Sequence, residues 1–258
     1  MGNNGVALQL VGLGLGLLGI GSSWAGGFAD TVARVKQSVV AVGTYQKTDK
    51  PPARFLGTGF AVRDGHHVLT NFHVLKEAQQ EADRHGLAVF FRRNKRIIVR
   101  KAEVAGRDRR FDLALLHIQG EPLRPLALGT DASVREGQRF AFTGFPIGMV
   151  LGLHPVTHRG IVSAVTPIAT PVSNARQLDR KLIQRLSKPY TVFQLDATAY
   201  PGNSGSPLYR PQSGKVVGII NKVFVKESKE SLLKNPSGIT YAIPIERATE
   251  LLAEGASE

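Results

Sequence analysis

The stretch Asp196-Ala-Thr-Ala-Tyr-Pro-Gly-Asn-Ser-Gly-Ser-Pro-Leu208 holds a serine, Ser204, between small residues in a tight turn. Small neighbours let a substrate backbone approach the Ser204 hydroxyl. The turn can also direct successive N–H groups of the segment Gly202, Asn203 and Ser204 towards one point, those of Gly202 and Ser204 in particular, which is what an oxyanion site requires. Taken alone, the string is equally consistent with a simple β-turn.

Two other segments favour the nucleophile over the turn. His73 follows the strand-like residues 67–69 and is expected at a strand end. Asp112 stands at the start of the apolar run 113–116, where a carboxylate is costly unless it is hydrogen-bonded. The order His73, Asp112, Ser204 is the chain order of the chymotrypsin-type triad. We therefore expect the first two residues in one lobe, Ser204 in the next, and the site in the cleft between them.

Short apolar segments separated by glycine and proline run along most of the chain, which favours a β-sandwich or β-barrel over alternating strands and helices. The expected strands are 38–43, 59–62, 67–70, 88–91, 96–100, 113–118, 139–143, 157–165, 191–195, 216–223 and 240–242. Helical periodicity predicts a short N-terminal helix over 28–36, a helix over 176–186 and a C-terminal helix over 245–252.

These motifs resemble the trypsin-like peptidase domain of the HtrA family. The resemblance runs from about Phe28 to Leu252, and Ser206 stands where a second glycine is usual. It implies an all-β, chymotrypsin-like fold of two six-stranded antiparallel barrels, with lobes at about 38–120 and 135–245. It also implies hydrolysis of peptide bonds with no metal or organic cofactor. The matching segments are 70–74, 107–118, 144–148 with 159–163, 202–208 and 238–244.

The resemblance also implies a specificity pocket and a substrate class. Thr198 would lie at the base of the pocket for the side chain before the cut. Because Thr198 is uncharged, we expect a small or medium apolar preference rather than Lys or Arg. Ile220, Asn221 and Lys222 would form a pocket wall and the strand that pairs with an extended substrate. Lys222 leaves an acidic preference open. Unfolded or exported proteins are the expected substrates.

The N-terminus has the pattern of an export signal. Residues 6–20 are almost entirely apolar, and Ser23-Trp24-Ala25 offers small residues for cleavage after Ala25. We expect a signal peptide over 1–25 and a peptidase domain over 26–258, in the periplasm or secreted. An uncleaved anchor is the alternative, although the run is shorter than the roughly 20 residues of a spanning helix. We expect no PDZ domain in this chain, and the oligomeric state stays open, a homo-oligomer included.

Composition excludes several classes of site. The chain has no cysteine, which excludes a cysteine nucleophile, disulfides and thiolate metal sites. The net charge is +13, so the surface attracts polyanions, but no nucleic-acid-binding signature accompanies that charge and we expect no nucleic-acid partner. Two other functions remain open: a catalytically silent binding module for unfolded chains or polyanions, and an esterase that uses the same acyl chemistry.

Overall fold

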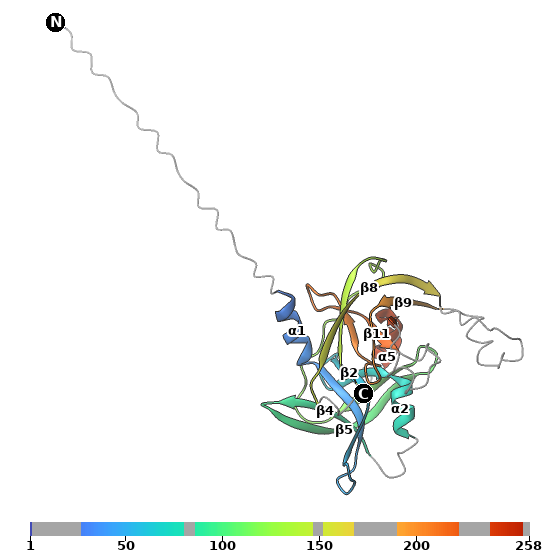
Figure 1. Cartoon of the computed structure of the whole chain (residues 1–258). Helices are drawn as coiled ribbons and strands as arrows, with labels where there is room; N and C mark the ends of the chain where they lie inside the picture. Colours follow the sequence, from blue (N-terminus) through green and yellow to red (C-terminus); the bar gives the residue numbers. More distant parts are fainter. Residues whose placement is uncertain (2–26, 80–85, 147–151, 168–189, 222–237, 255–258) are drawn as a thin grey trace, which may run out of the picture.

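The computed structural model describes residues 1, 27–79, 86–146, 152–167, 190–221 and 238–254 (Figure 1). Its strands close into two six-stranded antiparallel barrels, which confirms the predicted fold. Barrel 1, in the order β1-β2-β3-β6-β5-β4, consists of β1 (Val39–Tyr45), β2 (Ala53–Val62), β3 (His67–Asn71), β4 (Gly86–Arg93), β5 (Arg96–Asp108) and β6 (Leu113–Ile118). Barrel 2, in the order β10-β11-β12-β9-β8-β7, consists of β7 (Arg139–Gly144), β8 (Val156–Pro167), β9 (Thr191–Asp196), β10 (Pro207–Tyr209), β11 (Val216–Asn221) and β12 (Ile239–Pro244).

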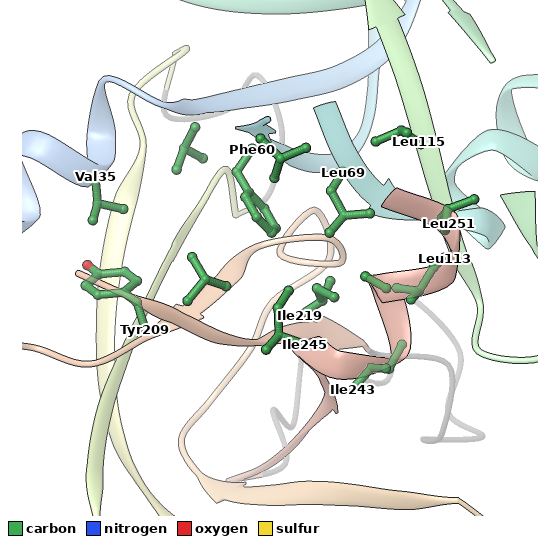
Figure 2. Close-up of a cluster of buried hydrophobic side chains, with 14 of the residues drawn as sticks. Val35, Phe60, Leu69, Leu113, Leu115, Tyr209, Ile219, Ile243, Ile245 and Leu251 are labelled. Atoms are coloured by element: carbon green, nitrogen blue, oxygen red, sulfur yellow. The ribbon is translucent and has the colours of Figure 1, made fainter. Parts of the chain in front are cut away.

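Several strands, β1 and β11 among them, are buried at almost every position because both of their faces are covered. On β1, Val40 and Val42 point into the interior of barrel 1, while Val39 and Ala41 join a second cluster that contains residues of both barrels. Figure 2 shows that shared cluster, with Phe60 of barrel 1 and Ile219 of barrel 2 among its members. The strands therefore do not show the simple in–out alternation of a one-sided sheet. The cluster between the barrels fixes how the two lobes meet, and hence the cleft.

The predicted strands all lie within observed ones or overlap them, with two differences near the motifs. The three-residue strand β10, directly after the serine motif, was not predicted because glycine and proline surround it. The segment after β3 is also not an extended strand end, because α2 (Phe72–Gln79) begins one residue before His73. The predicted signal peptide over 1–25 and the predicted helix over 176–186 lie outside the described residues, apart from Met1.

The two chain ends of the described body are helical, as predicted. Helix α1 (Phe28–Lys36) begins at Gly27, whose N–H donates to the Asp30 carboxylate at 2.9 Å. The 3-10 helix η3 (Ile245–Ala248) leads into α5 (Thr249–Glu254), and Leu251 of α5 packs against β5 at Gly106. None of the helices in the described ranges has the length and apolar character that crossing a membrane requires.

A pair of carboxyl groups lies where η3 meets the loop after residue 129. Burial, and then the neighbouring Glu246 carboxylate, raises the pKa of Asp131 to about 7. The Thr130 hydroxyl also donates to Glu246 at 2.7 Å. Asp131 therefore keeps a proton in the folded protein at pH values where an ordinary aspartate is ionised.

Candidate active site

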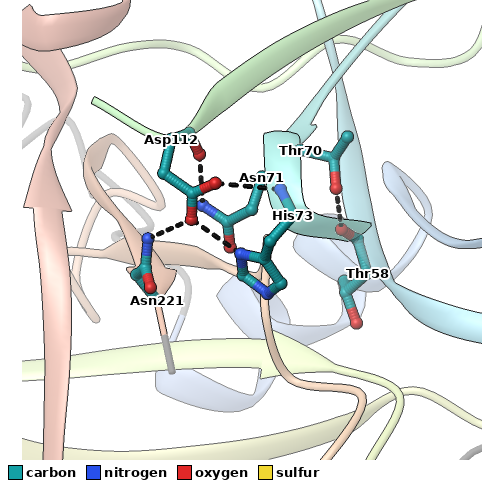
Figure 3. A network of polar contacts seen from close by, with 6 residues as sticks. All are labelled: Thr58, Thr70, Asn71, His73, Asp112 and Asn221. Carbon is teal, nitrogen blue, oxygen red and sulfur yellow. Dashed lines mark hydrogen bonds and ion pairs between the residues drawn. The ribbon is translucent and has the colours of Figure 1, made fainter. Parts of the chain in front are cut away.

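Asp112 holds His73 through both its backbone and its side chain. The Asp112 Oδ2 atom lies 2.6 Å from His73 Nδ1, and Oδ1 accepts the backbone N–H of His73 at 2.9 Å (Figure 3). The Asp112 carbonyl accepts the N–H of Phe72 at 3.0 Å and the Asn71 amide at 3.1 Å. The first turn of α2 is therefore tied to the residue that precedes β6.

The backbone of Asp112 is in the left-handed region, with φ of 54°. Short polar residues such as aspartate tolerate this conformation better than others. It occurs next to β6, whose partner β3 ends just before α2, with Asn71 opposite Leu113. Neighbouring strands of one barrel thus bring together two residues that are far apart in sequence.

The pairing sets the protonation pattern of the imidazole. A carboxylate can only accept at Nδ1, so Nδ1 carries the proton and Nε2 presents its lone pair on the other side of the ring. The His73 and Asp112 side chains are 22% and 18% exposed, so the bond is partly shielded from water. This arrangement suits a general base.

The side chain of Asn221, from strand β11 of barrel 2, also contacts the His73–Asp112 pair. Its Nδ2 donates to Asp112 Oδ2 at 2.7 Å, so that oxygen receives two donors. Asn221 is predicted to form part of the wall of a substrate pocket, and the structure shows in addition that its amide donates to Asp112. An asparagine at the end of a strand carries no sequence signal for this contact.

Ser204 lies in a loop in which several backbone carbonyl groups accept hydrogen bonds. The Asn203 N–H donates to the Tyr200 carbonyl at 3.0 Å, and the Ser206 N–H donates to the Asn203 carbonyl at 3.0 Å. Gly202 and Gly205 both have left-handed φ values, 96° and 87°. Within the described part of the chain, the N–H groups of Gly202 and Ser204 have no protein acceptor, so they are free to bind an oxyanion, whereas the N–H of Asn203 is engaged.

Strand β2 brings the serine loop and the histidine helix together. The Thr58 N–H donates to the Ser204 carbonyl at 2.8 Å. A Cβ on Gly57 would lie 2.6 Å from the Val74 side chain and 3.1 Å from the Ser204 carbonyl oxygen. Ser204 and the residue after His73 therefore lie against the same glycine.

Ser204 is 6% exposed, and among the described residues no hydrogen bond joins its hydroxyl to His73. Such bonds are often long in free enzymes and tighten with substrate.

The predicted specificity residues do not all line one pocket. The Ile220 side chain points into the core of barrel 2, its N–H donates to Ser206 and its carbonyl accepts Gly205, both at 2.9 Å. The predicted role of Ile220 in pairing with substrate is therefore corrected, because these groups are already used. Thr198 is half-buried in the loop before Ser204. Lys222 lies outside the described residues.

His158, a histidine outside the three motifs, lies beside the same loop. Its ring stacks on Phe142 with centroids 4.8 Å apart, and it lies 6.3 Å from the Tyr200 ring. Burial lowers the pKa of His158. In the described ranges, no group of three or more His, Asp or Glu side chains is arranged to hold a metal ion.

Comparisons with known proteins show which family the chain belongs to. Residues 57–219 match the trypsin-like peptidase domain. A probable periplasmic serine endoprotease DegP-like from Pseudomonas fluorescens is 32% identical over 203 residues, covering 77% of this chain and 34% of the relative. A protein of the same name from Halomonas elongata is 30% identical over 198 residues, with the same two coverages. The chain thus spans about a third of the length of these curated relatives.

Solved structures of HtrA-type proteases have a similar fold. The HtrA-type protease AlgW with tripeptide superposes with a TM-score of 0.63 at 26% identity, covering 88% of this chain and 63% of that one. Deg5, at 24% identity, shares the fold with a TM-score of 0.61 and covers 86% of this chain and 90% of its own. The chain therefore belongs to the trypsin-like peptidase family, with HtrA proteases among its relatives.

Proposed function

We propose that this chain is a serine endopeptidase that uses Ser204 as nucleophile, His73 as general base and Asp112 as the residue that orients the base. The observation that carries the proposal is the 2.6 Å bond between Asp112 and His73 Nδ1, on an imidazole whose helix packs against the same strand as the serine loop. That bond leaves Nε2 as the acceptor for the serine proton.

The chemistry follows from these roles. His73 Nε2 takes the Ser204 proton as Oγ attacks the substrate carbonyl carbon, and Asp112 stabilises the imidazolium that forms. The free N–H groups of Gly202 and Ser204 hold the negative oxygen of the tetrahedral intermediate. His73 then gives its proton to the leaving amine, which leaves an acyl group on Ser204. Water, deprotonated by His73, attacks the acyl carbon, and its proton passes through His73 back to Ser204.

Unfolded proteins outside the cytoplasm are the proposed substrates. Two observations support this class: the apolar N-terminal run followed by Ser23-Trp24-Ala25, and relatives whose names describe periplasmic endoproteases. Unfolded chains present the extended backbone that a trypsin-like cleft accepts. The preference for a small or medium apolar residue before the cut stays a prediction from Thr198.

The test is active-site labelling followed by protein digestion. A fluorophosphonate should label the mature chain at Ser204, and casein should be degraded by the unaltered protein but not by Ser204→Ala. Equal casein cleavage by both forms would end the proposal. Labelling at Ser204 without any peptide cleavage would favour an esterase. A folded chain that neither labels nor cleaves would favour the binding module.

A further inference from the structure

We propose that Thr58 is a positioning residue for the oxyanion site: it holds the carbonyl groups of Gly202 and Ser204, and so fixes the two peptide planes on either side of the one that carries the Ser204 N–H. The inference rests on the proposed peptidase function. It concerns a residue on a strand of barrel 1, outside all three predicted motifs.

Thr58 is fully buried, and each of its polar groups has a partner. Its hydroxyl donates to the Gly202 carbonyl at 2.7 Å, and its N–H donates to the Ser204 carbonyl at 2.8 Å. The hydroxyl oxygen accepts the Phe145 N–H at 3.0 Å, which directs its single proton towards Gly202. The Thr58 carbonyl accepts the Thr70 hydroxyl at 2.7 Å, a bond drawn beside His73 in Figure 3.

These bonds hold consecutive peptide planes of the serine loop. A carbonyl fixes the plane of the peptide bond that follows it, because the peptide unit is rigid. Thr58 thus fixes the plane after Gly202 and the plane after Ser204. The intervening plane, which contains the Ser204 N–H, is held by the Asn203 carbonyl, which accepts from Ser206. In a trans peptide the N–H points opposite to the C=O of the same plane, so the Asn203 carbonyl, held by Ser206, leaves the Ser204 N–H on the opposite side of that plane. The two planes that Thr58 holds keep this one from turning.

The loop needs such an external anchor because of its glycines. Gly202 and Gly205 have left-handed backbones and no side chain that could pack and hold the loop. The Gly205 backbone also approaches the Thr58 carbonyl so closely that a Cβ there would lie 1.9 Å from the carbonyl oxygen. The orientation of the loop around the Ser204 N–H therefore depends on strand β2, where Thr58 supplies the bonds to the peptide planes before and after that donor.

The experiment compares Thr58→Val with a matched variant, Thr143→Val. Thr143 is equally buried and its hydroxyl also makes two bonds, to Thr157 and Tyr209 at 2.9 Å each, and neither partner belongs to the loop around Ser204. The measured quantity is the second-order rate of fluorophosphonate reaction with folded full-length chain across pH. Circular dichroism and thermal unfolding report the fold of each variant.

We expect Thr58→Val to lower the plateau rate by about 10–100-fold, less than or similar to the loss of one oxyanion donor. The apparent pKa of the rate profile should stay where it is, because the base is untouched. Thr58→Ser should restore the rate to within about threefold, since it keeps both hydroxyl bonds. Thr143→Val should lose stability without losing plateau rate.

If Thr58→Val and Thr143→Val react equally fast, the proposal for Thr58 fails while the peptidase proposal stands. If the unaltered chain does not react at Ser204, both fail. Should Thr58→Val not fold, Thr58→Cys takes its place, because a thiol is a weaker donor of similar size. If Thr58→Cys reacts as fast as the unaltered chain, the proposed role of Thr58 is overturned. If Thr58→Cys reacts more slowly and Thr58→Ser does not, the role is supported.

Discussion

Gly205 and Gly137 form a natural pair for measuring how closely the serine loop is pressed against barrel 1. Their φ values are similar, +87° and +81°. A Cβ on Gly205 would lie 1.9 Å from the Thr58 carbonyl oxygen and 2.6 Å from the Thr70 hydroxyl oxygen, whereas a Cβ on Gly137 would meet no atom within 4 Å. An alanine at either position thus adopts the same unfavourable backbone, and only one of the two collides.

The expected losses follow from this difference. A left-handed L-residue costs about 1–2 kcal/mol, partly offset by about 0.4–1 kcal/mol from the less flexible unfolded chain. Gly137→Ala should therefore lower the free energy of unfolding by about 1 kcal/mol or less. Gly205→Ala must in addition displace a buried carbonyl by about 1 Å, and overpacking of this kind costs about 1–3 kcal/mol. The total of about 1–4 kcal/mol corresponds to a Tm lower by roughly 2–16 °C.

The assay is urea and thermal unfolding of both variants, combined with the rate of fluorophosphonate labelling at Ser204. Gly205→Ala should lose both stability and labelling, because the displaced loop carries the nucleophile. Gly137→Ala should keep the labelling rate of the unaltered chain. Equal stability losses in the two variants, or full labelling of Gly205→Ala, would refute the close approach of the serine loop to β2.

Three further changes test other parts of the structure. Asn221→Ala removes the 2.7 Å bond to Asp112 and should lower the labelling rate by about 10–100-fold, because hydrogen bonds to charged groups contribute about 1.5–3 kcal/mol; an unchanged rate would deny Asn221 any part in the site. Asp131→Asn should stabilise the fold at pH 8 but not at pH 5. The folded pKa of Asp131, about 7, lies above its unfolded value near 4, so the native chain holds an extra proton between those values and loses stability as pH rises. The side-chain amide of this variant could still donate to Glu246. Because the site is partly exposed, we expect the variant to gain only about 1 kcal/mol in stability at pH 8, measured from Tm. A stability difference between variant and unaltered chain that is the same at every pH would contradict the proton held by Asp131. Tyr209→Phe should cost about 1 kcal/mol in urea unfolding and leave labelling unchanged, since its buried hydroxyl bonds to Thr143 of barrel 2. A loss of labelling would show that the effect reaches the site.

Residues 38–43, 113–118 and 191–195 show how much of the fold local pattern predicts. Each is a β-branched or apolar run bounded by turns, and each lies in or overlaps an observed strand. The strand β10 was missed because three residues between glycine, proline and a turn carry too little pattern. Helix α2 was missed because Asn71, a residue type that favours helix starts, is also the last residue of β3, and a short helix that follows a strand directly carries little periodic pattern.

The sequence by itself indicated an all-β fold, because apolar runs and glycine turns are local features, while the resemblance of its motifs to the HtrA peptidase domain indicated the two barrels and supported the candidate residues His73, Asp112 and Ser204. Only the tertiary structure decided which other residues serve them. The bond from Thr58 to Gly202 spans 144 positions and the bond from Asn221 to Asp112 spans 109. Both depend on how two closed barrels pack against each other, and that packing is set by the buried cluster between them rather than by any local run of residues.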